Sequence, residues 1–191
     1  MLQPISGHYT DAAATDQAAT EVSASSLVLL GLTSLLLSLY HAGFFPLSVE
    51  VLGIGIFYGA VGLIATGLVA WKRHNAFGAV FGIAFGLFWL SLVAMVVMPE
   101  SGFGRSPQSS ALSSYLALWG LFASILLTGA SRLGRELVIF LSMLAVFLLL
   151  LAAGAVAESP LLNALAGGEG IACGLVGIYA GFVRFSAETR K

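Results

Sequence analysis

Six long apolar segments constrain this chain more than any other feature of its sequence. Each runs for about 20 residues with few charged side chains, the length that an α-helix needs to cross a bilayer. The segments are Ser26–Phe45, Val51–Trp71, Ala76–Met98, Ala111–Ala130, Leu137–Ala157 and Pro160–Phe185. Because lipid offers no water to bond the backbone, each segment must be helical. The sequence therefore predicts an all-α integral membrane protein with six transmembrane helices.

Charged side chains are scarce along the whole chain. Only 9% of the 191 residues are charged and 59% are hydrophobic, whereas soluble domains carry about 25% charged residues. The formal net charge is −1, and 8 Lys and Arg residues cannot supply the basic surface that a nucleic acid requires. We therefore expect membrane lipid, and no nucleic acid, around this protein.

The positions of Lys and Arg predict the orientation of the chain. If the chain crosses six times, both termini and two loops share one side, which collects Lys72, Arg73, Arg132, Arg135, Arg184, Arg190 and Lys191. On the other side, Arg105 is the only basic residue, beside Glu50, Glu100 and Glu158. Because short loops rich in Lys and Arg stay in the cytoplasm, we expect cytoplasmic N and C termini and a multi-pass protein of the cell membrane.

One membrane domain with two short tails is predicted. Residues 1–25 are polar and lack the basic segment and short apolar run of a signal peptide, so we expect a flexible cytoplasmic tail. Residues 26–185 then form the six-helix domain, and residues 186–191 form a cytoplasmic C-terminal tail.

Glycines recur at helical spacing inside the predicted spans. They form the stripes Gly55/Gly59, Gly78/Gly82/Gly86, Gly170/Gly174 and Gly177/Gly181. Small residues four apart let two helices approach closely in lipid. We therefore expect tight helix packing at these positions, within the chain or across subunits.

Polar residues on the first span form a candidate pore lining. Ser34, Ser38 and His41 follow Leu30 at intervals of four, four and three residues, which keeps all of them near one helical face. Alternatively, each serine bonds the carbonyl four residues earlier, and His41 sits at the outer headgroup level. His41 is also a candidate proton sensor, because an unperturbed imidazole titrates near neutral pH.

Glu169 is the only acidic residue within an otherwise apolar, glycine-rich span. A carboxylate inside a membrane is costly and is therefore a candidate protonation site. It precedes Arg184 by 15 residues, or about 22 Å of helix, which places it near the outer third of the membrane. Both a wet vestibule and a buried proton relay remain alternatives at this depth.

The sequence contains none of the familiar catalytic patterns. It has no HExxH, no GxSxG, no glycine loop between a strand and a helix, and no paired carboxylates at usable spacing. We expect no enzymatic activity, and thus no catalytic residues, metal site or cofactor.

Several short segments of the chain form a further pattern. They are Gly55-Ile-Phe-Tyr-Gly59, Asn75-Ala-Phe-Gly78, Phe88-Trp89-Leu90, Met98-Pro99, Tyr115-Leu-Ala-Leu-Trp119-Gly120 and Gly170-Ile-Ala-Cys173-Gly174. In these segments, and over about Leu27 to Tyr179 with almost no gaps, the chain resembles the acetate uptake transporter family. The resemblance implies a homohexamer of six-helix subunits, each with a central pore for small monocarboxylates.

The resemblance also implies particular site residues. The family's apolar pore constriction, formed by a Phe, a Tyr and a Leu, falls here on Leu30, Phe85 and Leu144, so two of the three differ. The family's Asn-Pro-Ala-Pro-Leu-Gly-Leu signature falls on residues 21–27, which read Glu-Val-Ser-Ala-Ser-Ser-Leu. Serines such as Ser26 are candidate hydroxyl donors in place of the missing Asn.

Transport of acetate or a similar small monocarboxylate, with succinate as a further candidate, is the expected function. Because a bare carboxylate is costly in an apolar neck, we expect the neutral acid to cross, which makes uptake proton-linked. Ser34, Ser38 and Tyr58 are expected to hold the carboxyl group on either side. Channel and symporter remain alternatives, as do a channel for urea, an amide or ammonia, and a non-conducting membrane scaffold.

Overall fold

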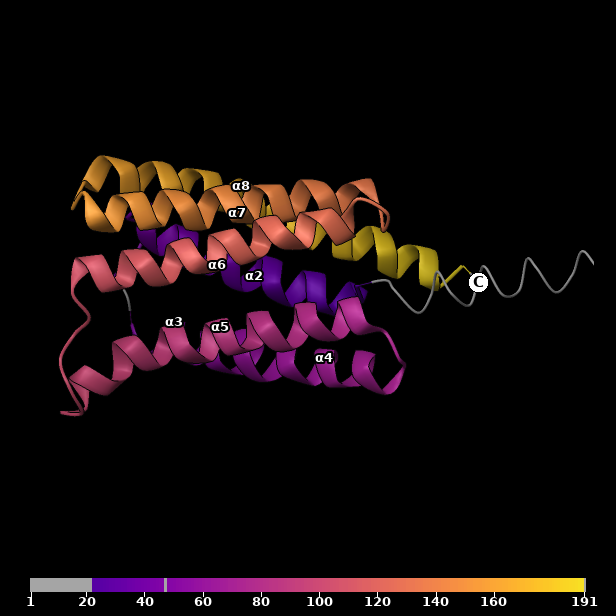
Figure 1. Ribbon diagram of the computed structural model, residues 1–191, viewed down its shortest axis with the longest axis horizontal. Coiled ribbons are helices and arrows are strands. Elements are labelled where there is room, and N and C mark those ends of the chain that lie inside the picture. Colours follow the sequence, from indigo (N-terminus) through magenta and orange to yellow (C-terminus); the bar gives the residue numbers. More distant parts are fainter. Residues whose placement is uncertain (1–21, 47, 191) are drawn as a thin grey trace, which may run out of the picture.

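The computed structural model describes residues 22–46 and 48–190, and this part of the chain is helical outside its loops. Its elements are α2 (Ala24–His41), α3 (Val49–Ile54), η1 (Gly55–Gly62), α4 (Leu63–Lys72), α5 (Ala76–Glu100), α6 (Ser109–Ala130), α7 (Arg135–Val156) and α8 (Pro160–Glu188). The long helices lie side by side along the long axis of the molecule (Figure 1). Within the described residues, six segments are long and apolar enough to cross a membrane, with α3, η1 and α4 counted as one. The predicted six-helix fold is confirmed.

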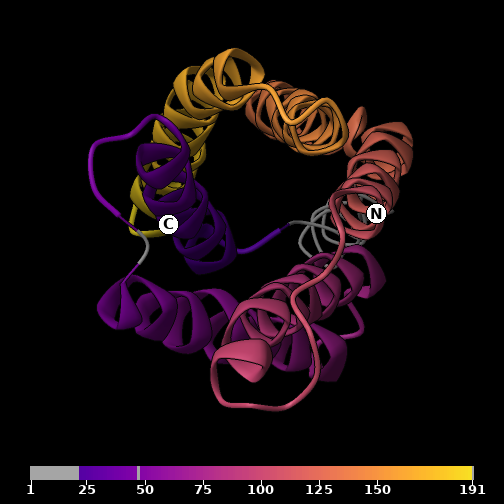
Figure 2. The ribbon, with the colours of Figure 1, turned by 90° about the vertical axis from the view of Figure 1, so that its left-hand side faces the viewer.

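Helices that follow one another in the sequence mostly pack together. The α4 helix packs on α5, α6 on α7, and α7 on α8. The exception is α2, which packs along the last helix, α8. Seen end-on, the helices surround a common axis (Figure 2), and apolar side chains fill the middle of the bundle. This axis contains the candidate site.

Glycines bring the backbones of α2 and α8 into contact. A Cβ atom added to Gly31 would lie 2.7 Å from the nitrogen of Ile178 and 2.8 Å from the oxygen of Gly174, so no larger residue fits there. The backbones of Gly67 and Gly82 meet in the same way between α4 and α5. The close packing predicted at Gly82 and Gly174 is therefore confirmed, and it occurs within one chain.

The second span is not a continuous α-helix. Residues Gly55–Gly62 form the π-helix η1 between α3 and α4. Its hydrogen bonds span one more residue than those of an α-helix, and such turns are often found at functional sites. The apolar composition that predicts this span does not distinguish the two helix types, so hydropathy cannot predict η1.

The first span is shorter at one end than predicted. The α2 helix ends at His41 rather than at Phe45. Gly43 adopts a φ of 84°, and its N–H donates to the Tyr40 carbonyl at 3.0 Å, while the Phe44 N–H donates to the Leu39 carbonyl at 3.0 Å. This pattern is a Schellman motif, which ends a helix at a glycine even within an apolar run.

The predicted tails differ from the structure in their boundaries. The α2 helix begins at Ala24, inside the predicted tail of residues 1–25. The rest of that prediction, residues 1–21, lies outside the described residues. At the other end of the chain, α8 continues through Phe185 to Glu188, so most of the predicted C-terminal tail is helical.

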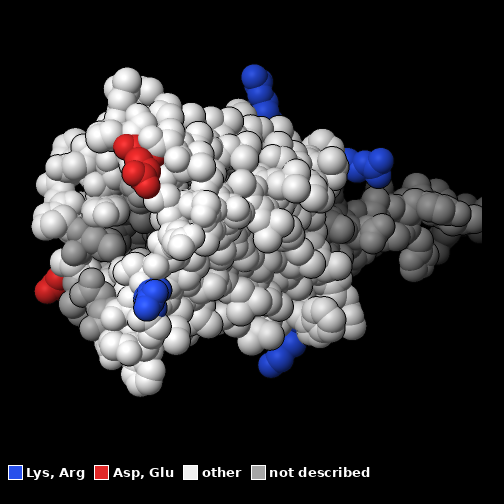
Figure 3. Space-filling view, turned by 60° about the vertical axis from the view of Figure 1, so that its left-hand side comes forward, with Lys and Arg blue, Asp and Glu red and all other residues white. Residues whose placement is uncertain are grey.

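The two ends of the bundle differ in charge. The basic end, where α2 begins and α8 ends, contains Lys72, Arg73, Arg132, Arg135, Arg184 and Arg190. The acidic end contains Glu50 and Glu158, together with Arg105. Figure 3 shows acidic side chains at one end and most basic side chains toward the other. The predicted orientation rests on this charge separation and stays a prediction.

Arg184 joins three parts of the chain at the basic end. Its Nη1 donates to the carbonyl of Val22 at 2.8 Å, and its Nη2 donates to the carbonyl of Leu133 at 3.1 Å. The last helix is thereby tied to the segment before α2 and to the turn between α6 and α7. A basic residue that the sequence used to predict orientation thus also has a structural role.

Candidate functional site

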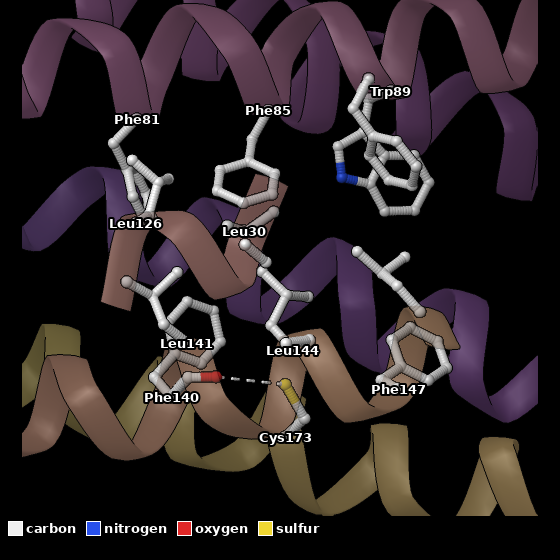
Figure 4. Packing of buried hydrophobic residues seen from close by; sticks show 14 of the residues in the cluster. Leu30, Phe81, Phe85, Trp89, Leu126, Phe140, Leu141, Leu144, Phe147 and Cys173 are labelled. Atoms are coloured by element: carbon white, nitrogen blue, oxygen red, sulfur yellow. Dashed lines mark hydrogen bonds between the residues drawn. The ribbon is translucent and has the colours of Figure 1, made fainter. Parts of the chain in front are cut away.

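Three apolar side chains from three helices meet near the middle of the bundle. Leu30 of α2, Phe85 of α5 and Leu144 of α7 are buried, with 1%, 0% and 2% of their surface exposed. Figure 4 shows Leu30 between Phe85 and Leu144. We call these three residues the neck. They are the residues that the family resemblance selected, and the structure brings them together.

Ring contacts hold Phe85 in position. Its ring centroid lies 5.1 Å from that of Phe81 and 5.8 Å from that of Phe122, both edge to face, an arrangement that aromatic pairs favour. One turn further along α5, Phe88 stacks on Tyr115, whose hydroxyl donates to the Phe88 carbonyl at 2.8 Å. The α5 and α6 helices therefore form an aromatic wall beside the neck.

A small cavity lies between the neck and the acidic end. Its volume is about 170 Å³, and its lining includes Leu37, His41, Trp89 and Leu116. A second cavity of about 570 Å³ shares His41 and Leu116 with it and also touches Glu158. We call the first the inner cavity and the second the outer cavity. The inner cavity, the more apolar of the two, reaches Trp89, one turn of α5 beyond Phe85, although none of the three neck residues lines either cavity.

A third cavity lies at the basic end. Its volume is about 690 Å³, and its lining includes Ser23, Ser26, Thr66 and Arg73. The Ser26 hydroxyl donates to the Thr66 hydroxyl at 2.8 Å, and it lies 2.7 Å from the hydroxyl of Ser23. The Thr66 hydroxyl in turn donates to the Leu63 carbonyl at 2.8 Å. We call this the basic cavity, and its wall carries a chain of hydroxyl groups.

The polar residues of α2 have different surroundings. The Ser38 hydroxyl donates to the Ser34 carbonyl at 2.6 Å, and His41 Nδ1 donates to the Leu37 carbonyl at 2.9 Å. The alternative that serines bond their own helix is therefore confirmed for Ser38. The Ser34 hydroxyl has no hydrogen-bond partner among the described residues, although Ser34 is 2% exposed. Of the two serines, only Ser34 keeps its hydroxyl group uncommitted.

Two of the predicted site residues lie away from the cavities and the neck. Tyr58 of η1 has 49% of its surface exposed and lines none of the three cavities described above. Glu169 of α8 is partly buried, and its Oε2 has no hydrogen-bond partner in the described part of the chain. It also lines none of these cavities. The structure does not bring either residue together with Ser34 and the neck.

Trp89 was not among the predicted site residues. It is 5% exposed, and it lines the inner cavity next to Gly55. The sequence contributed Trp89 only as part of the Phe88-Trp89-Leu90 motif. The sequence could have indicated Trp89 as a site residue only through its chemistry, because an indole carries an N–H donor that a phenyl ring lacks.

Comparisons with known proteins agree on the family. The family described as GPR1/FUN34/yaaH matches residues 8–191. The chain is 38% identical over 149 residues to the succinate-acetate/proton symporter SatP of Escherichia coli, covering 78% of this chain and 79% of SatP. It is also 36% identical over 166 residues to an uncharacterized protein of Methanothermobacter thermautotrophicus, covering 83% and 81% of the two chains.

A solved structure shows the same fold. It is described as the structure of the bacterial acetate channel SatP, and it matches with a TM-score of 0.84 at 35% sequence identity. The match covers 87% of this chain and 92% of the SatP chain. Together with the six apolar spans, these similarities establish a multi-pass membrane protein. The chain belongs to the GPR1/FUN34/yaaH family.

Proposed function

We propose that this protein carries acetate and similar small monocarboxylates, with the dicarboxylate succinate as a further candidate, across the cell membrane along the axis of the bundle. The observation that carries the proposal is a buried apolar neck with a cavity on either side, in a chain whose relative SatP is named as a succinate-acetate/proton symporter. The small inner cavity suits a short acid. Transport, rather than catalysis, is the role that this arrangement supports.

The neck contains no polar side chain. Where the family has a tyrosine, this chain has Phe85, so Leu30, Phe85 and Leu144 offer no hydrogen bond to a crossing carboxylate. An unpaired carboxylate in such surroundings is costly, and a neutral carboxylic acid costs far less. We propose that the neutral acid crosses the neck, which couples transport to protons. The Ser34 hydroxyl on one side of the neck, and the hydroxyl groups of the basic cavity on the other, then form hydrogen bonds with the carboxyl group.

Flux measurements in proteoliposomes test this function. Labelled acetate uptake is measured over a range of pH, with and without a potassium diffusion potential. We expect flux that grows at acid pH and does not depend on voltage. Voltage-driven flux that follows the acetate anion would contradict the neutral route. Uptake of urea without acetate would instead indicate a channel for neutral solutes, and no uptake of either would indicate a scaffold.

Passive permeation of acetic acid requires a matched control. The variant Leu30→Trp fills the neck, so the protein-dependent flux should fall to the level of protein-free liposomes. The variant Leu118→Trp adds the same bulk on the outer surface, where Leu118 is 64% exposed, and should keep its flux. Equal flux through both variants would show that acetate does not pass the neck.

We also propose that the chain forms a homohexamer, as the family resemblance implies. Large apolar side chains cover the outer surface, among them Phe57, Leu118, Leu161 and Phe182. Such side chains contact either lipid or neighbouring subunits. Native mass spectrometry of the protein released from lipid nanodiscs should give a mass of six chains, and a monomeric mass would contradict the assembly.

A further inference from the structure

The indole nitrogen of Trp89 is a buried donor without an acceptor. Trp89 has 5% of its surface exposed, and its Nε1 has no hydrogen-bond partner among the residues that the structure describes. Buried tryptophan N–H groups usually find a partner, and an unpaired one needs a physical explanation.

The π-helix η1 fixes the indole ring. A Cβ atom added to Gly59 would lie 2.5 Å from Cγ and 2.8 Å from Cδ2 of Trp89, and one added to Gly55 would lie 3.3 Å from its Cε3. The ring thus lies against two glycines of η1. Phe88 meets it edge to face, with ring centroids 5.7 Å apart. Because η1 covers the ring on one side, the indole cannot swing toward that helix to find an acceptor.

The N–H group points toward the neck. Figure 4 shows the nitrogen of Trp89 on the side of the ring that faces Phe85 and Leu30. Trp89 also lines the inner cavity. The donor therefore lies at the point where an acid moving inward leaves this cavity and meets the neck.

A second uncommitted polar group lies at the same level. Trp89 follows Phe85 by four residues on α5, and Ser34 follows Leu30 by four residues on α2. Both helices begin at the basic end, so each residue lies about 6 Å beyond the neck toward the acidic end. Ser34 is on the same face of α2 as Leu37, which lines the inner cavity. Its hydroxyl, like the indole N–H, has no partner within the described residues.

We propose that Trp89 Nε1 and the Ser34 hydroxyl bind the carboxyl group of the substrate on the acidic-end side of the neck. Trp89 is the specificity-determining residue of this pair, because an N–H donor fixed among apolar side chains favours a carboxyl oxygen over an apolar solute. The Ser34 hydroxyl can donate or accept a hydrogen bond, so the pair can bind both the neutral acid and its anion. At rest, apolar side chains cover the nitrogen, and substrate entering the neck displaces them. This inference rests on the proposed transport of monocarboxylates.

Transport kinetics provide the first test. Trp89→Phe keeps a six-membered aromatic ring and removes the pyrrole ring with its N–H donor. We therefore expect the KM for acetate to rise about tenfold, the usual effect of losing a hydrogen bond to a carboxylate. Trp71→Phe is the matched control, because Trp71 is 69% exposed and lines none of the three cavities. Its KM should stay within twofold of wild type. An unchanged KM in Trp89→Phe, with normal wild-type uptake, would overturn the role of Trp89.

The indole resonances provide a second test, in which the response to acetate is read on the wild-type protein. In protein labelled with ¹⁵N-tryptophan, each of the 3 tryptophans gives one indole N–H signal, assigned with the two Trp→Phe variants. Acetate should move the Trp89 proton signal downfield, as hydrogen bonding does, whereas chloride at equal ionic strength should not. The Trp71 signal should not move.

The two tests separate this inference from the proposed function. If the wild-type protein carries acetate but the Trp89 signal stays fixed at saturating acetate, the carboxyl site is absent and the transport function stands. If the Trp89 signal responds to acetate but no flux occurs, the binding site stands and the transport function fails.

Discussion

The two approaches to the neck differ in their chemistry. Toward the acidic end, the inner cavity of about 170 Å³ is mostly apolar, with Leu37 and Leu116 in its wall. Toward the basic end, the cavity of about 690 Å³ is bordered by hydroxyl groups such as those of Ser26 and Thr66, and by Arg73. On the proposed route, an acid would therefore lose its water before the neck on one side and meet polar groups again on the other. Because a donor excluded from water interacts more strongly, the few polar groups of the apolar side should matter most.

The largest expected effect comes from changing the wall of the apolar side. In Gly59→Leu the new side chain collides with the indole of Trp89, and overpacking of this kind costs about 1–3 kcal/mol. We expect a lower unfolding temperature and loss of acetate uptake. Gly53→Leu is the control on the same span, because a Cβ atom at Gly53 meets nothing within 4 Å. Size-exclusion chromatography after heating measures the unfolding temperatures of the two variants, and labelled uptake measures their acetate transport. Equal unfolding temperatures would contradict the close contact between Gly59 and Trp89.

Smaller side chains in the neck should widen the constriction between the inner cavity and the basic cavity. Phe85→Ala removes a ring that is completely buried. The uptake of the larger acids lactate and succinate relative to acetate should therefore rise about tenfold, the scale on which apolar pockets discriminate by size. Leu30→Ala should act in the same direction. Phe182→Ala, at a ring that is 64% exposed, is the control. Unchanged selectivity in both neck variants would refute the constriction.

Removing a hydroxyl group on the polar side should have a smaller effect. Ser26→Ala takes one hydroxyl from the wall of the basic cavity, and we expect the KM for acetate to rise about threefold, within the range for a single neutral hydrogen bond. Ser38→Ala should leave the KM unchanged, because the Ser38 hydroxyl is already committed to the Ser34 carbonyl. A larger effect from Ser38 than from Ser26 would reverse this assignment. Labelled uptake over a range of acetate concentrations measures both constants.

The smallest expected effect concerns His41, which lines both cavities of the acidic-end approach. An imidazole that takes up a proton at acid pH can give it to an arriving carboxylate. We expect His41→Gln to halve acetate uptake at acid pH and to leave it unchanged at alkaline pH. His74→Gln, in the loop between α4 and α5, is the control. The same fractional loss at both pH values would indicate a steric effect rather than proton transfer.

The fold was more predictable from the sequence than the site was. Hydropathy identified all six spans, because the length of an apolar run reports directly on the thickness of the bilayer. It missed the end of α2, since Gly43 stops the helix by backbone geometry rather than by polarity. It also missed η1, whose hydrogen bonds span an extra residue and change which side chains face inward. Tyr58 lies in this segment and is half-exposed, although an inward position was expected.

The neck residues came from resemblance alone, because nothing in the spacing of Leu30, Phe85 and Leu144 indicates that they meet. The role proposed for Trp89 was beyond sequence reasoning for a different reason. An unpaired donor is defined by the acceptors that are absent around it, and those depend on how α5, η1 and α2 pack. The stripe from Ser34 to His41 was predictable as a face, but only the structure separates the committed hydroxyl of Ser38 from the free one of Ser34.

The contact between α2 and α8 also constrains how the protein is made. The first described helix finds its main partner in the last one, and Gly31 cannot meet Gly174 until the ribosome has synthesised α8. Until then, the glycine face of α2 contacts lipid or the insertion machinery, because α2 is synthesised before its packing partner α8. Arg184 then ties the finished α8 to Val22. The bundle is therefore closed only after α8 has been synthesised.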